Sequence, residues 1–75
     1  MRIEINYGRG EDLDRFTIFD ERNDGWWEVR SFQDGWWHVE TESTASVIRT
    51  IAEAWRQHLQ GKKIAIWVDG ELIVY

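Results

Sequence analysis

Two copies of the tetrapeptide Asp-Gly-Trp-Trp, at residues 24–27 and 34–37, constrain this chain more than any other feature. In each copy a tight-turn dipeptide precedes two bulky aromatic residues, a pattern typical of a hairpin turn that leads into a strand. Successive side chains of a strand point to opposite faces of the sheet. Each tryptophan pair must therefore divide between the two faces, so two of these four side chains lie outside any single core.

Alternating apolar and polar residues predict six strands and one helix. The expected strands cover residues 2–7, 15–21, 26–32, 36–41, 63–68 and 71–75, and the expected helix covers 44–60. Ser43 is a suitable N-cap for that helix, and Gly61 is a suitable C′ residue. With 75 residues, the chain is predicted to be a single α+β domain, residues 1–75. Its mostly antiparallel β-sheet (order along the chain β-β-β-β-α-β-β) has one helix packed on one face, and we expect the last hairpin to pair beside the first strand.

The turn at Asp34-Gly35 decides which residues of its two strands share a face. A two-residue loop places Val29 opposite Glu40 on the neighbouring strand, and it mixes apolar and charged side chains on both faces of the sheet. A three-residue loop, residues 33–35, places Val29 opposite Val39 and separates apolar from charged side chains between the two faces. We therefore expect the three-residue loop here.

The sequence predicts the register at one of the other two hairpin turns and leaves the register at the second open. The same reasoning applied to residues 68–70 predicts that Ile66 pairs with Leu72. At residues 22–25, a three-residue loop that opposes Phe19 to Val29 and a four-residue loop that opposes Ile18 to Val29 fit the sequence equally well. The register of the second strand therefore stays open.

These registers predict an inner and an outer face of the sheet. The inner face, which meets the apolar stripe of the helix, is expected to hold Ile3, Ile5, Trp27, Val29, Trp37 and Val39. The stripe itself consists of Val47, Ile48, Ile51, Ala52, Trp55 and Leu59. The outer face is expected to hold the aromatic residues Trp26, Phe32 and Trp36 within a polar rim of Glu28, Arg30, His38 and Glu40.

The composition excludes several classes of site. The chain has no cysteine and two histidines, so it cannot form a disulfide, a thiolate nucleophile or a cysteine zinc site. Its net charge of −5 has the wrong sign for a protein that neutralises phosphates. We predict no catalytic residue, no cofactor and no metal, and interpret the acidic stretch 11–14 and the glycines at 8 and 10 as a solvated loop. No segment has the apolar length of a membrane span, so a cytoplasmic protein is expected.

The outer-face aromatics predict the function. Monomers seldom expose large apolar patches, and tryptophan is enriched in binding hot spots. In size, acidity, lack of cysteine and aromatic hairpins, the chain resembles small phage or mobile-element inhibitors of host enzymes, including anti-CRISPR proteins; that resemblance is one of build and carries over no residue. The outer-face aromatics and the acidic balance predict a non-enzymatic module that binds a basic face of another protein.

Four alternatives stay open beside that interpretation. The aromatic face could form a homodimer, or the loop before the second strand could cover it. A single-stranded nucleic-acid binder is disfavoured, because such surfaces combine stacking aromatics with a positively charged groove. A designed miniprotein fits the three Asp-Gly turns but not the paired exposed tryptophans.

Overall fold

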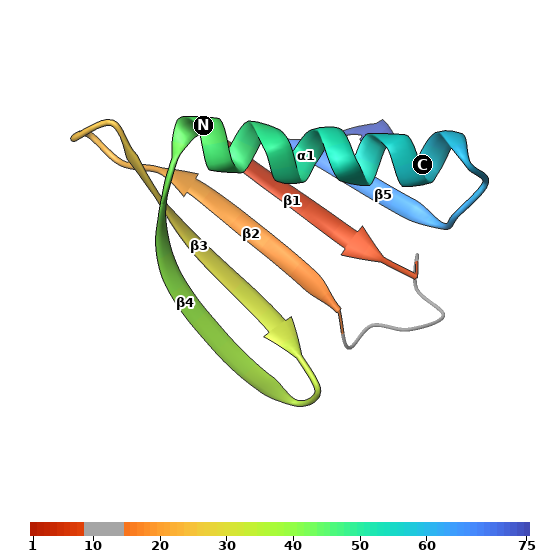
Figure 1. The fold of residues 1–75 in the computed structure, drawn as a ribbon, viewed down its shortest axis with the longest axis horizontal. Helices are drawn as coiled ribbons and strands as arrows, with labels where there is room; N and C mark the ends of the chain where they lie inside the picture. Colours follow the sequence, from red (N-terminus) through yellow and green to blue (C-terminus); the bar gives the residue numbers. More distant parts are fainter. Residues whose placement is uncertain (9–14) are drawn as a thin grey trace.

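The computed structural model describes residues 1–8 and 15–75 (Figure 1). These residues form six strands and one helix. The predicted acidic loop falls mostly on residues 9–14, which lie outside the described residues. The alternative in which this loop covers a sheet face lies outside them as well. The elements are β1 (Arg2–Tyr7), β2 (Phe16–Glu21), β3 (Trp26–Gln33), β4 (Trp36–Ser43), α1 (Thr44–Leu59), β5 (Ile64–Val68) and β6 (Glu71–Val74). This order confirms the predicted α+β class.

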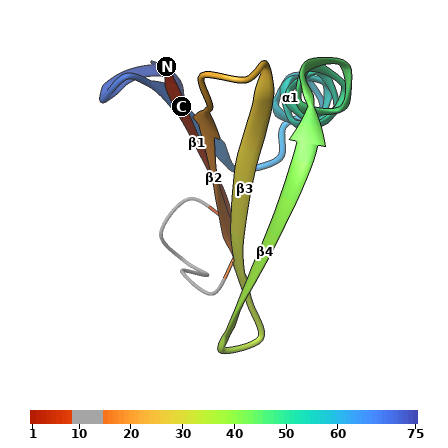
Figure 2. The ribbon, with the colours of Figure 1, turned by 90° about the vertical axis from the view of Figure 1, so that its left-hand side faces the viewer.

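All six strands form one antiparallel sheet in the order β4-β3-β2-β1-β5-β6. The helix lies against one side of it (Figure 2). The expected placement of the last hairpin beside the first strand is confirmed, because β5 pairs with β1. The connection through α1 thus carries the chain from one edge of the sheet to the far side of β1. We call the helix side the inner face and the opposite side the outer face.

The helix begins and ends where the sequence predicts. The Ser43 hydroxyl accepts a hydrogen bond from the backbone N–H of Ser46 at 3.2 Å, which satisfies a donor that the first turn leaves unpaired. Gly61 follows the C-cap residue Gln60 with φ of 87°, and its N–H donates to the carbonyl of His58. A residue with a side chain adopts that φ only with strain, so the glycine defines the end of α1.

The core lies between α1 and the middle of the inner face. Its buried members are Ile3, Ile5, Phe19, Trp27, Val29, Val47, Ala54, Ile64, Ile66 and Val74. Trp27 also joins the sheet to the start of the helix, because its indole N–H donates to the Thr44 hydroxyl at 3.0 Å. Four of the predicted inner-face residues are therefore in the core: Ile3, Ile5, Trp27 and Val29.

The β3–β4 hairpin closes through a two-residue turn, so the expected three-residue loop is wrong. Val29 pairs with Glu40, not with Val39. Asp34 and Gly35 both have positive φ, 55° and 82°, as a type I′ turn requires. β4 is an edge strand, and the half of the hairpin near the turn extends beyond α1 (Figure 1). The two faces of this half therefore need not separate apolar from polar side chains. Turn chemistry therefore sets the register.

This register exchanges the two faces of β4 relative to the expectation. Trp36, His38 and Glu40 lie on the inner face, because they pair with inner-face residues of β3. Trp37 and Val39 lie on the outer face and are not part of the core, since they are 50% and 63% exposed. A shift of a single residue in pairing accounts for all five differences.

The other hairpins settle one open question and correct one expectation. Phe19 pairs with Val29, so the 22–25 region contains the three-residue loop, and Gly25 has φ of 87° at its last position. The β5–β6 hairpin has a two-residue turn at Asp69-Gly70, and Ile66 pairs with Val74 rather than with Leu72. A bulge lies beside that pair, and it gives β6 one extra residue.

Only part of the predicted helix stripe meets the sheet. Val47 is buried and Ile51 is partly buried against the core, whereas Ile48 and Leu59 are exposed. Each residue turns an α-helix by about 100°, so Ile48 faces well away from Val47. Trp55, expected in the core, is 46% exposed and contacts the ring of His58. The flank of α1 formed by Ile48, Ala52, Trp55 and Leu59 therefore lies outside the core.

Candidate partner-binding surface on the β3–β4 hairpin

An aromatic row crosses the outer face near the tip of the β3–β4 hairpin. Phe16 pairs with Phe32, and Phe32 pairs with Trp37, so the three rings lie side by side on β2, β3 and β4. The ring centroids of Phe16 and Phe32 are 5.6 Å apart, and each is 5.3 Å from that of Trp37. The Trp37 ring meets both phenylalanines by its edge or at a steep angle, a favourable arrangement for aromatic pairs. The row is thus a preformed, rigid apolar surface.

The next row of the outer face extends this surface. Ile18 pairs with Arg30, and Arg30 pairs with Val39, so two aliphatic side chains flank one guanidinium. No element among residues 1–8 and 15–75 packs on this side, because α1 lies on the inner face (Figure 2). We call Phe16, Ile18, Phe32, Trp37 and Val39 the outer-face patch. At the far end of β3, Trp26 faces the same side and is 49% exposed.

A network of ion pairs borders the outer-face patch. Asp20 accepts hydrogen bonds from Arg2 Nε at 2.7 Å and from an Arg30 Nη atom at 3.2 Å, and Arg30 Nε lies 3.5 Å from the Glu28 carboxylate. The hydrogen bond from Arg2 is the largest cause that holds the pKa of Asp20 below its ordinary value, and the charges of Arg2 and Arg30 act in the same direction. Arg30 is therefore held between the patch and the network.

Asp20→Asn is expected to flatten the acid limb of the stability profile. Because the folded-state pKa of Asp20 is lowered, its contribution is present above the unfolded pKa, near 4, and is lost as the pH falls through the folded value. We expect a loss of about 1 kcal/mol at pH 7, since the group is partly exposed. Urea unfolding of both proteins at pH 7 and pH 3 measures this. Equal differences at the two pH values would contradict it.

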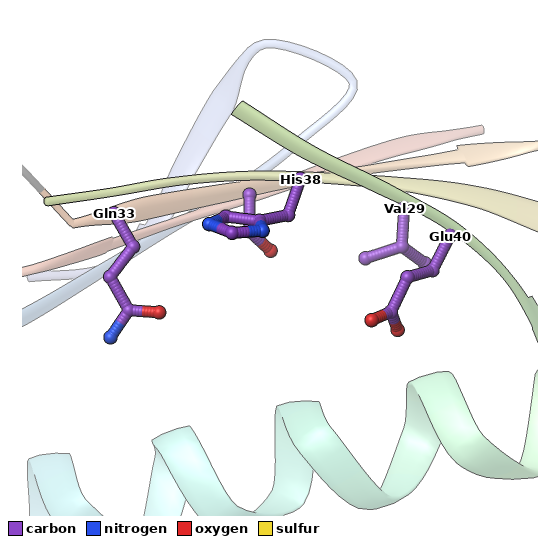
Figure 3. Close-up of a pocket in the computed structure, with 5 residues that line it drawn as sticks. Val29, Gln33, His38 and Glu40 are labelled. Carbon is purple, nitrogen blue, oxygen red and sulfur yellow. The ribbon is translucent and has the colours of Figure 1, made fainter. Parts of the chain in front are cut away.

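The inner face of the same hairpin carries a polar hollow beyond the end of the core. Val29, Ser31, Gln33, His38 and Glu40 line it. The labelled side chains lie on the side of the hairpin that faces α1 (Figure 3). Ser31 pairs directly with His38, whereas the expected three-residue loop would have paired Arg30 with His38. Trp36, on the same face next to the tip, is 73% exposed.

Ser31, His38 and Glu40 are the residue types of a hydrolytic triad, but their connections differ from one. The Ser31 hydroxyl is paired with the Thr17 hydroxyl at 3.3 Å. Within the described residues, the His38 side chain has no hydrogen bond to the side chain of Ser31 or of Glu40, although a triad depends on both links. The three residues are neighbours on a strand face, and their arrangement suits solvated polar contacts.

The sites predicted from the sequence are therefore divided between the two faces. Trp26, Glu28, Arg30 and Phe32 lie on the outer face, as expected. The expectation that Trp36, His38 and Glu40 join them there is wrong, because the two-residue turn places these side chains on the inner face. Both sets belong to the same hairpin, so the hairpin presents aromatic side chains in two opposite directions.

The residues that complete the outer-face patch were assigned elsewhere by the sequence. Trp37 and Val39 were expected in the core, and Phe16 had no assigned face. The signal that places Trp37 and Val39 was present in the Asp-Gly dipeptide, which favours a two-residue type I′ turn. The signal for Phe16 was the register of the 22–25 loop, which the sequence left open.

The net charge of the protein is concentrated on this hairpin and its entry. Between Asp20 and Glu42 the chain has seven acidic and two basic residues, a difference of five negative charges. The remaining residues contain seven of each sign, so this segment carries the whole net charge of −5. An acidic field around exposed aromatics favours encounter with a positively charged surface.

Two further chemical features of the described residues concern metals and membranes. No group of three or more His, Cys, Asp or Glu residues is placed there to hold a metal ion. The helix α1, within the same part of the chain, is neither long nor apolar enough to cross a bilayer.

Comparison with known proteins gives no family for this chain: no protein-family model, no curated protein and no solved structure matches it.

Proposed function

We propose that this protein is a non-enzymatic binding module that recognises another protein through the outer-face patch. The observation that carries the proposal is the aromatic row Phe16–Phe32–Trp37, which no described element covers. Rigid aromatic anchors dominate the energetics of protein interfaces, and the polar network beside them provides a rim. Trp37 is the expected anchor, because it is both packed at its edge and 50% exposed.

The charge of the hairpin supports a partner with a basic face. Seven acidic residues lie between Asp20 and Glu42, on the same hairpin as the aromatic row and its entry, and Arg30 is already held by Asp20 and Glu28. A basic surface of an enzyme, such as a channel that holds nucleic acid, has the complementary charge. Binding there would block the enzyme sterically, so we propose a small inhibitor of the phage or mobile-element kind that acts in the cytoplasm.

Affinity capture tests this function with two adjacent tryptophans. The wild type, Trp37→Ala and Trp36→Ala are immobilised and exposed to lysate of the source organism, and the bound proteins are quantified by mass spectrometry. We expect a partner to be retained by the wild type and by Trp36→Ala but lost from Trp37→Ala, because only Trp37 belongs to the outer-face patch. Circular dichroism confirms that each bait is folded.

The salt dependence of the same interaction provides a second readout. With the purified partner, we expect the association rate to fall as ionic strength rises, since the acidic hairpin steers the encounter. Retention of the partner by Trp37→Ala at the wild-type level, together with an association rate that does not respond to salt, would contradict the proposed function.

A further inference from the structure

The two edges of the sheet differ in how they are protected against pairing with another strand. The edge strand β6 is short, with four residues, and a bulge disrupts its pairing with β5. Short strands and bulges are devices that natural proteins use to block an edge. The opposite edge strand, β4, has eight residues in an unbroken register and contains neither proline nor lysine. Its free edge therefore lacks the short length and the bulge that protect β6.

The register of the hairpin determines which peptide groups of β4 are available. The residues that flank a two-residue turn exchange hydrogen bonds, and hydrogen-bonded pairs then alternate along an antiparallel ladder. Trp36, His38 and Glu40 thus direct their peptide groups toward β3. Trp37 and Val39, with Thr41 beyond them, direct theirs toward the open edge. An added antiparallel strand must bond to these outward-facing residues.

We propose that the strand added to this edge is β4 of a second copy of the chain, with Val39 opposite the partner's Val39. In this two-fold arrangement Trp37 faces the partner's Thr41, and these pairs are hydrogen-bonded. His38 faces the partner's Glu40 in a pair that is not hydrogen-bonded, where side chains approach more closely. The same contact occurs twice, so each imidazole faces a carboxylate of the other copy and the edge is complementary to itself.

The side chains of β4 also select this register over its neighbours. Moving the two-fold axis by one residue, from Val39 to Glu40, places Glu40 opposite the partner's Glu40. A shift in the other direction places His38 opposite the partner's His38. Two carboxylates directly opposite each other are destabilising, and two facing imidazoles each lose the carboxylate partner that the Val39 register provides. The two-fold axis at Val39 is the register in which each His38 meets a carboxylate.

This dimer goes beyond the proposed function and does not depend on it. It uses the edge of β4 and its inner-face charges, whereas recognition of another protein uses the outer-face patch. Pairing through Val39 would join the outer faces of the two copies into one continuous sheet surface, with Trp37 of each chain near the seam. A dimer would therefore present the aromatic row twice.

Charge exchange on β4 tests the proposed pairing. Sedimentation equilibrium at low salt, over a wide concentration range, gives the dissociation constant of the dimer for the wild type, His38→Glu, Glu40→Lys and the double variant. Each single variant should raise that constant about tenfold or more, because His38→Glu creates two facing carboxylate pairs and Glu40→Lys removes the carboxylate that each imidazole faces. The double variant should return to within about threefold of the wild type, since each pair then joins a carboxylate and an ammonium group of opposite charge.

An introduced cysteine tests the register independently, because the chain contains no other thiol. In the proposed dimer Val39→Cys places two Cα atoms about 5.5 Å apart, a distance suited to a disulfide. The matched variant Thr41→Cys places them about 13 Å apart, beyond the reach of a disulfide. Under mild oxidation, rapid dimer cross-linking of Val39→Cys alone is expected. A wild type that stays monomeric at all concentrations, a double variant without rescue, or equal cross-linking of the two cysteine variants would overturn the proposal.

Discussion

Trp27→Ala is expected to lower the free energy of unfolding by about 3–5 kcal/mol, whereas the same change at its neighbour Trp26 should cost less than about 1 kcal/mol. Trp27 is 5% exposed, and its indole N–H donates a hydrogen bond to the Thr44 hydroxyl at the start of α1. The substitution thus removes a large core side chain together with the link between sheet and helix. Trp26 is 49% exposed on the outer face.

Urea unfolding followed by far-ultraviolet circular dichroism measures both effects without relying on tryptophan fluorescence. A domain of this length has a total stability of roughly 4–11 kcal/mol, so Trp27→Ala removes a large part of it. Trp27→Phe keeps most of the volume and should lose less, which gives a folded variant if the alanine form does not fold. Similar losses for Trp26→Ala and Trp27→Ala would contradict the assignment of the two side chains to opposite faces.

Phe19→Ala should also lower the stability by about 3–5 kcal/mol, and the adjacent Ile18→Ala by about 1–2 kcal/mol. Phe19 is 1% exposed, and it is among the largest fully buried side chains of the described residues. Ile18 is half-buried on the outer face, opposite Arg30. This pair of variants tests the three-residue loop at residues 23–25, since a four-residue loop would place Ile18 in the core instead.

The same unfolding experiment serves for these two variants. A larger loss for Ile18→Ala than for Phe19→Ala would contradict the β2–β3 register. Because Val29 pairs with Phe19 in that register, such a result would also remove the physical basis for the position of Phe16 in the outer-face patch.

The sequence predicts most of the fold because its local signals agree with the global packing. The strand alternation of residues 2–7, the Ser43 N-cap and the Gly61 C′ residue each specify a local structure that the tertiary contacts preserve. The pairing of β5 with β1 follows from the length of α1, which carries the chain across the sheet. In these segments a single reading of the pattern fits both the element and its burial.

The candidate site is harder to predict from the sequence, because it lies on the part of the hairpin that α1 does not cover. There the burial of apolar side chains does not determine the strand register. The preference for a Val29–Val39 pair assumed that both strands have one apolar face, but the hairpin extends beyond α1 and β4 has no such face. Turn chemistry at Asp34-Gly35 then prevails, and it turns Trp37 outward and Trp36 inward. The helix gives a parallel case, since its apolar stripe extends to Ile48 and Leu59, which no described element covers.

Both corrections sharpen the functional hypothesis. Side chains that the sequence assigned to the core, above all Trp37, are those the geometry offers to a partner. The inner-face residues Trp36, His38 and Glu40 become the charged and aromatic flank of an open strand edge. The two proposals thus use different parts of the hairpin: the outer-face patch for another protein, and the open edge of β4 for a second copy of the chain.

The measurement that tests the central claim most directly is the affinity of the captured partner for Trp37→Ala and for Trp36→Ala, each titrated by calorimetry against the wild type. The two side chains are adjacent in the chain and lie on opposite faces of one hairpin. Trp37→Ala should raise the dissociation constant about 30-fold or more, as expected for a hot-spot anchor, and Trp36→Ala should change it less than about threefold. Equal effects of the two substitutions, or a larger effect of Trp36→Ala, would contradict recognition through the outer-face patch.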